Sequence, residues 1–188
     1  YDTTEARFLY RPTDSKKWER LSVVDQSGNI DQGFRPIAVD AAKNIVYGFD
    51  QKDGYQALFS IALDGTNERK LVIGRNDVDV DGLIRMGRKN RIIGASYATE
   101  KRFVKYFDPE LEKLASGLGK ALPGKPLVSI VDASEDENEI LLIASSDSDP
   151  GALYLFTKDT RQLSELLPLR DPLIGREMGK MTPISYPA

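Results

Sequence analysis

The amino-acid sequence predicts an all-β protein made of repeated antiparallel sheets, and three observations support that class. Short apolar or alternating runs are separated by clusters of turn-forming residues, most plainly at residues 138–167, where three strands and two turns follow one another. Three such runs begin with an asparagine, and these residues, Asn44, Asn90 and Asn138, are 46 and 48 residues apart. A period of about 40 to 50 residues with four strands per repeat is typical of the blades of a β-propeller.

Each repeat is expected to contain four strands. The first strands are expected at residues 34–39, 82–86 and 127–131, and the second strands at residues 44–49, 90–95 and 138–143. The third strands carry aromatic residues and are expected at residues 58–61, 103–107 and 153–156, and the fourth at residues 69–73, 111–115 and 163–167. The sequence therefore predicts three blades, at about residues 34–73, 82–115 and 127–167.

The segments that flank these blades complete the expected organisation. Residues 5–24 are expected to form a half blade, with strands at residues 6–11 and 18–24 that correspond to the last two strands of a blade. The tail at residues 168–188 is rich in turn formers, and a further strand is expected to begin at residues 181–186. The whole of residues 1–188 is thus interpreted as a single propeller fragment of about three and a half blades, cut from a longer chain.

One stretch leaves a helix open as an alternative. Residues 116–125 contain Gly and Pro and are expected to form a connector, but residues 111–122 could instead form a short helix. The acidic and basic residues at 110–113 are the helix-like cluster in this part of the chain.

Composition excludes several classes of function. The chain has 26 Lys and Arg against 29 Asp and Glu, a net charge of −3, so it offers no basic field for nucleic acid. The longest apolar run, residues 140–144, is far shorter than the ~20 residues that cross a bilayer, so no membrane partner is expected. Cysteine is absent, which excludes disulfides and Cys-ligated zinc but fits either the bacterial cytoplasm or the periplasm.

The absence of histidine restricts catalysis further. A Ser-His-Asp triad needs an imidazole to accept the proton of the nucleophile, and none of the 188 residues supplies one. The nearest approach to a G-x-S-x-G nucleophile elbow, residues 94–98, ends in Ala98 and lies in an expected strand. The segment is therefore expected to contain no catalytic residue, no metal site and no cofactor site.

Acidic residues gather at two turns, and each cluster has a structural interpretation. Asp77, Asp79 and Asp81 alternate as in the first half of a calcium loop, but Arg88 stands where that loop needs a glutamate. An acidic connector between blades is the favoured reading of this motif. The cluster at residues 147–151 is likewise interpreted as a chain reversal stabilised by aspartate. Because almost every acid falls in a turn, paired carboxylates for glycoside hydrolysis are not expected.

Aromatic residues at strand positions allow two interpretations, packing between blades or stacking on a ligand, and packing is favoured. They are Tyr47, Phe49, Tyr55, Phe59, Tyr106, Phe107 and Tyr154.

Several stretches, taken in order, resemble the propeller of bacterial prolyl oligopeptidase family serine peptidases, in particular the acylaminoacyl peptidase and dipeptidyl aminopeptidase-like branch. They are residues 18–21, 33–38, 77–82, 106–109, 146–155 and 181–186. In that family the propeller precedes an α/β-hydrolase domain that carries the Ser, Asp and His, and residues 183–186 resemble the strand that leads into it. The resemblance assigns no catalytic residue to this chain. It implies a non-catalytic segment that covers the active site and restricts access to short peptides, with the hydrolase domain as its partner.

Two other functions stand beside this one. The alternative is a propeller-type interaction module or scaffold without a peptidase, although the WD-repeat form is disfavoured because Trp18 is followed by Glu19 and His is absent. A small stand-alone enzyme is disfavoured by the missing catalytic groups. An open arc of blades also leaves uncovered apolar faces at its ends, so self-association is expected.

Overall fold

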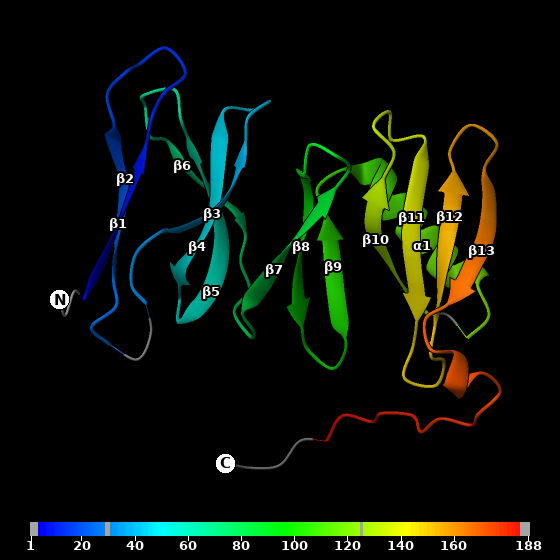
Figure 1. The fold of residues 1–188 in the computed structure, drawn as a ribbon. Coiled ribbons are helices and arrows are strands. Elements are labelled where there is room, and N and C mark those ends of the chain that lie inside the picture. Colours follow the sequence, from blue (N-terminus) through cyan, green and yellow to red (C-terminus); the bar gives the residue numbers. More distant parts are fainter. Residues whose placement is uncertain (1–3, 29–30, 125, 185–188) are drawn as a thin grey trace. The chain divides into compact units, whose positions relative to one another are not determined.

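The computed structural model describes residues 4–28, 31–124 and 126–184. The chain divides into two compact units, Tyr1–Asp81 and Gly82–Ala188. Figure 1 shows that the described strands follow one another in antiparallel sheets, which contain two, four, three and four strands. The predicted all-β class is confirmed.

The first unit contains a hairpin and a four-stranded sheet. The hairpin is formed by β1 (Glu5–Tyr10) and β2 (Glu19–Asp25). The sheet contains β3 (Arg35–Asp40), β4 (Ile45–Lys52), β5 (Tyr55–Ala62) and β6 (Arg69–Ile73), in that spatial order. Because neighbours in sequence are neighbours in the sheet, it has the meander topology of a propeller blade, and we call such a sheet blade-type.

The turn between β4 and β5 is a tight hairpin. Lys52 pairs with Tyr55, so the connection is reduced to two residues, Asp53 and Gly54. Both have positive φ, 53° and 87°, as a tight type I′ hairpin requires.

One apolar cluster of the first unit lies between its four-stranded sheet and the preceding hairpin. Phe34, Val46 and Ile61 form a cluster against which Leu21 of β2 packs. The cluster therefore joins the sheet to the hairpin.

The second unit contains two sheets and a helix. The three-stranded sheet is formed by β7 (Val80–Met86), which begins two residues before the unit boundary, β8 (Arg91–Ala98) and β9 (Arg102–Tyr106). Helix α1 (Pro109–Ala121) follows. A blade-type sheet then contains β10 (Leu127–Ala133), β11 (Glu139–Ser145), β12 (Ala152–Thr157) and β13 (Gln162–Pro168), before a 3₁₀ turn, η1 (Asp171–Leu173).

The expected fourth strand at residues 111–115 and the connector at 116–125 are wrong, because α1 occupies most of this stretch. Asp108 caps the helix by accepting a hydrogen bond from the Glu110 N–H at 2.9 Å. Pro109 stands at the start of the helix, and Leu111 and Ala115 are buried beneath it. The strand expected from residue 181 is also absent at residues 181–184, while residues 185–186 lie outside the described part.

The repeat seen in the sequence recurs in the structure. Asn44, Asn90 and Asn138 each directly precede the second strand of their sheets. Asn44 and Asn90 have positive φ, 52° and 51°, whereas in the last repeat Glu137 takes that conformation, with a φ of 57°. Asn138 instead accepts a hydrogen bond from the Asp159 N–H at 3.1 Å.

The two blade-type sheets also share their irregularities. The first pair of strands shifts register between Pro36 and Ala38 in one sheet and between Ile130 and Asp132 in the other. The last pair shifts at residues 58–59 and 153–154. Because bulges re-aim side chains at set places in a sheet, shared bulges indicate that the same unit is repeated.

The core of the second unit joins its two sheets and the helix. Its buried members come from β7 to β9, α1, β10 and β11: Met86, Ile93, Tyr106, Leu111, Ala115, Val128, Ile130, Ile140, Leu142 and Ala144. One face of the β10–β13 sheet therefore packs against the preceding sheet and α1.

Candidate functional site

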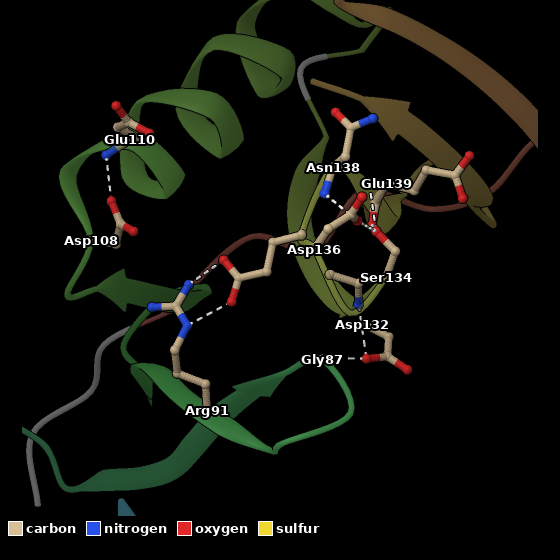
Figure 2. A network of polar contacts seen from close by, with 11 residues as sticks. Gly87, Arg91, Asp108, Glu110, Asp132, Ser134, Asp136, Asn138 and Glu139 are labelled. Atoms are coloured by element: carbon tan, nitrogen blue, oxygen red, sulfur yellow. Dashed lines mark hydrogen bonds and ion pairs between the residues drawn. The ribbon is translucent and has the colours of Figure 1, made fainter. Parts of the chain in front are cut away.

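One cluster of charged residues in the second unit lies where the β7–β8 turn meets the β10–β11 turn (Figure 2). Arg91 donates two hydrogen bonds to the Glu137 carboxylate, from Nε to Oε1 at 2.8 Å and from Nη2 to Oε2 at 2.7 Å. Both side chains are about one-third exposed, at 34% and 29%. This bidentate ion pair joins the start of β8 to the β10–β11 turn of the next sheet.

At the same junction, two other acidic side chains accept hydrogen bonds from nearby backbone N–H groups and from a hydroxyl. The Gly87 N–H donates to Asp132 at 2.9 Å, and the Asp136 carboxylate accepts from the Ser134 hydroxyl at 2.6 Å and from the Asn138 N–H at 3.1 Å. The hydrogen bond from the Ser134 hydroxyl, followed by that from Asn138, lowers the pKa of Asp136. These carboxylates stabilise turns, so the junction is a structural site.

The acidic motif at residues 77–82 does not gather its carboxylates around a cation. Arg75 binds Asp77 through Nε at 2.8 Å and Nη2 at 2.6 Å, and the hydrogen bond from Arg75 lowers the pKa of Asp77. Asp79 instead accepts from the Gln56 N–H at 2.6 Å. In the described residues no group of three His, Cys, Asp or Glu side chains is placed to hold a metal ion.

The turn at residues 146–151 contains two aspartates with different partners. Asp149 accepts from the Gly151 N–H at 2.8 Å, in agreement with the predicted aspartate-stabilised reversal. Asp147 accepts from the Met181 N–H at 2.8 Å, and that bond is the first cause of its lowered pKa. Sequence reasoning missed this contact, because 34 residues separate the two partners and no local pattern indicates it.

A hollow of about 510 Å³ lies in the second unit, within the size range of ligand pockets. Its walls come from the end of α1, the 148–151 turn, β12, β13 and the segment after η1. The Tyr154 hydroxyl lies 3.4 Å from Glu165 inside it, and Arg176 lines the same space. Desolvation, then the Glu165 charge, raises the pKa of Tyr154.

The aromatic residues mostly serve packing. Tyr47, Phe49 and Tyr106 are buried, with 4%, 6% and 4% of their surfaces exposed. The Tyr106 hydroxyl accepts a hydrogen bond from the Ile130 N–H at 3.0 Å, which holds β10 next to β9. Tyr154 differs, because it lines the hollow.

No described helix is long and apolar enough to span a membrane.

Among the comparisons with known proteins, matches were found with solved structures. No protein-family model and no curated protein matches the chain. Four chains of solved structures match, among them TolB from Acinetobacter baumannii, with a TM-score of 0.39 and 12% identity over 86% of this chain. The chain spans 41% of that TolB chain.

Proposed function

We propose that residues 1–188 form a non-catalytic propeller segment of a larger protein, and that this parent is a serine peptidase of the prolyl oligopeptidase family. The observation that carries the segment's non-catalytic role is the repeat itself. Two blade-type sheets share turns and bulges at equivalent positions. Asp136 and Asp149, at turns of the second of these sheets, accept hydrogen bonds from backbone N–H groups within the fold. The peptidase parent rests on the order of the sequence stretches that resemble that family.

The segment's role would be to cover the active site of a neighbouring α/β-hydrolase domain and to admit short peptides only. The absence of His supports a division of labour in which the hydrolase domain supplies all the catalytic groups. Antiparallel sheets suit a cover, since backbone hydrogen bonds hold neighbouring strands together.

The reading frame that encodes the chain provides the first test. If the proposal is correct, the sequence downstream of Ala188 contains a G-x-S-x-G elbow followed by Asp and His. A complete frame without them would contradict the peptidase parent and favour the interaction module.

Activity provides the second test. The 188-residue chain alone should not cleave chromogenic peptide or acyl-aminoacyl substrates, while the full-length protein should cleave short peptides and leave folded proteins intact. Turnover by the segment that a serine-directed inhibitor abolishes would contradict a non-catalytic role.

A further inference from the structure

The hollow of about 510 Å³ in the second unit combines apolar walls with a few charged groups. Its apolar walls include Leu122 just after α1, Pro168 at the end of β13 and Ile174 after η1. Glu165 and Arg176 lie in the same lining and carry opposite charges. A concave, mostly apolar space with a small number of charged groups is the usual composition of a small-molecule site.

The acidic group of the hollow is not required by the repeated fold. In the β12–β13 pair the register shifts next to Tyr154, which pairs with Glu165. At the equivalent bulge of the first blade-type sheet, Phe59 pairs with Leu71. The same sheet geometry therefore forms with two apolar residues at these positions, and Glu165 distinguishes the last sheet from the first.

The Glu165 carboxylate has no cationic partner among the described residues. Its one hydrogen-bond contact there is with the Tyr154 hydroxyl, at 3.4 Å. Desolvation raises the pKa of Tyr154 most, followed by the charge and hydrogen bond of Glu165 and then by the charge of Asp149, which also lines the hollow. The hollow is therefore negative around this phenol.

The Arg176 guanidinium is the basic group of the lining. The Arg176 N–H donates to the Leu173 carbonyl at 3.1 Å, in a turn that directly follows η1. In the described part of the chain no carboxylate pairs with the guanidinium, and this includes Glu165. Two opposite charges thus line one hollow and do not pair with each other.

We propose that the hollow binds a small zwitterion with an apolar body, which is the form of a free amino acid or a short peptide at neutral pH. Its ammonium group binds the Glu165 carboxylate, its carboxylate binds the Arg176 guanidinium, and its body lies against the apolar walls. A ligand with only one of these charges leaves the other protein group without a partner and binds more weakly. The proposal depends on the hollow alone and not on a peptidase parent.

An NMR titration of the ¹⁵N-labelled 188-residue chain tests the proposal with two probes, L-leucine and the dipeptide Leu-Leu. At least one of them should shift the amide signals of residues that line the hollow. Half-saturation is expected between about 0.1 and 10 mM, because the ligands are small and the charged groups are exposed. Tighter binding of leucine assigns the site to free amino acids, and tighter binding of Leu-Leu assigns it to short peptides.

Derivatives of the tighter ligand separate the two charges. The amide lacks the carboxylate and the N-acetyl form lacks the charged amine, so each should bind about fivefold more weakly, at the upper end of what an exposed ion pair contributes. Glu165→Gln should remove the difference between the zwitterion and its N-acetyl form. Arg176→Gln should remove the difference between the zwitterion and its amide. The matched control is Glu139→Gln, at an exposed position that begins β11, and it should bind like the unaltered chain.

The amide spectra also verify that each variant is folded. Absence of binding by both zwitterions at about 50 mM, far above the expected half-saturation, would overturn the proposal. Equal binding of the zwitterion and its two derivatives, unchanged discrimination in both variants, or signal shifts confined to residues outside the hollow would also overturn it. None of these results bears on the downstream reading frame, so the peptidase proposal is tested separately.

Discussion

Strands β8 and β11 hold the same place in successive repeats, yet they differ in how many of their faces are covered. In β8, residues on both faces are buried: Ile92 is 1% exposed and Ile93 is 0% exposed. In β11, Ile140 and Leu142 are buried, while Leu141 and Ile143 between them are half-buried. A nearly continuous apolar run is typical of a strand covered on both sides. The sequence of β11 therefore suits two covered faces, whereas in the described residues one of its faces is only partly covered.

The largest effect should come from truncating the covered face of β11. Leu142 is 1% exposed, and Leu142→Ala should lower the free energy of unfolding by about 2–5 kcal/mol through lost burial and a cavity. Leu141→Ala, one position away on the opposite and partly covered face of the strand, should cost about 1 kcal/mol. Urea denaturation at micromolar concentration measures both, and equal losses would show that the two faces are equally covered.

Substitution of a glycine by alanine should have opposite effects on stability in the buried strand β8 and at an exposed position of helix α1. A Cβ on Gly94 in β8 would lie 2.7 Å from the Lys105 carbonyl oxygen, so Gly94→Ala should cost about 1–3 kcal/mol. In α1, a Cβ on Gly117 would meet no atom within 4 Å, so Gly117→Ala should raise stability by about 0.5–1 kcal/mol. Thermal melts of the two variants should therefore shift in opposite directions. A shift of the same sign in both would mean that one of the two environments is misassigned.

A smaller effect on the free energy of unfolding is expected from the ion pair between Arg91 and Glu137, which joins turns of two sheets in the second unit. A double-mutant cycle with Arg91→Met and Glu137→Gln should give a coupling of about 1 kcal/mol, because the pair is two-pronged and partly buried. The exposed pair Arg7 and Glu5, whose side chains are 74% and 50% exposed, should give a coupling near zero. If the two cycles agreed, the Arg91 pair would not be holding the sheets together.

The smallest effect concerns pH. The pKa of Asp136 is lower in the folded chain, first through the Ser134 hydroxyl. Its contribution is therefore complete above the unfolded pKa, about 3.9, and is lost as the pH falls through the lower folded value. A carboxyl NMR titration should place the Asp136 midpoint below that of a free aspartate. A midpoint at or above the free value would exclude the turn hydrogen bonds.

The strands could largely be predicted from the sequence because turn residues mark their ends, as Asn44 and Asp53 do. Helix α1 was the alternative left open at residues 111–122 and not the preferred reading, although its signals are local: Asp108 at the cap, Pro109 after it, and Leu111 and Ala115 four residues apart. Gly117 and Gly119 weakened the helical pattern, and the repeat suggested a strand. The hollow around Tyr154 and the contact of Asp147 with Met181 each involve residues that are far apart in the sequence. No local sequence pattern could therefore predict them.

Thiol labelling tests the partly covered face of β11 most directly, since the chain has no cysteine of its own. Single cysteines at four β11 positions and one β8 position would be treated with a thiol reagent at micromolar concentration. The variants are Ile140→Cys, Leu141→Cys, Leu142→Cys, Ile143→Cys and Ile93→Cys. Our account predicts fast reaction at positions 141 and 143 and slow reaction at positions 140, 142 and 93. Equally slow reaction at all five positions would contradict it.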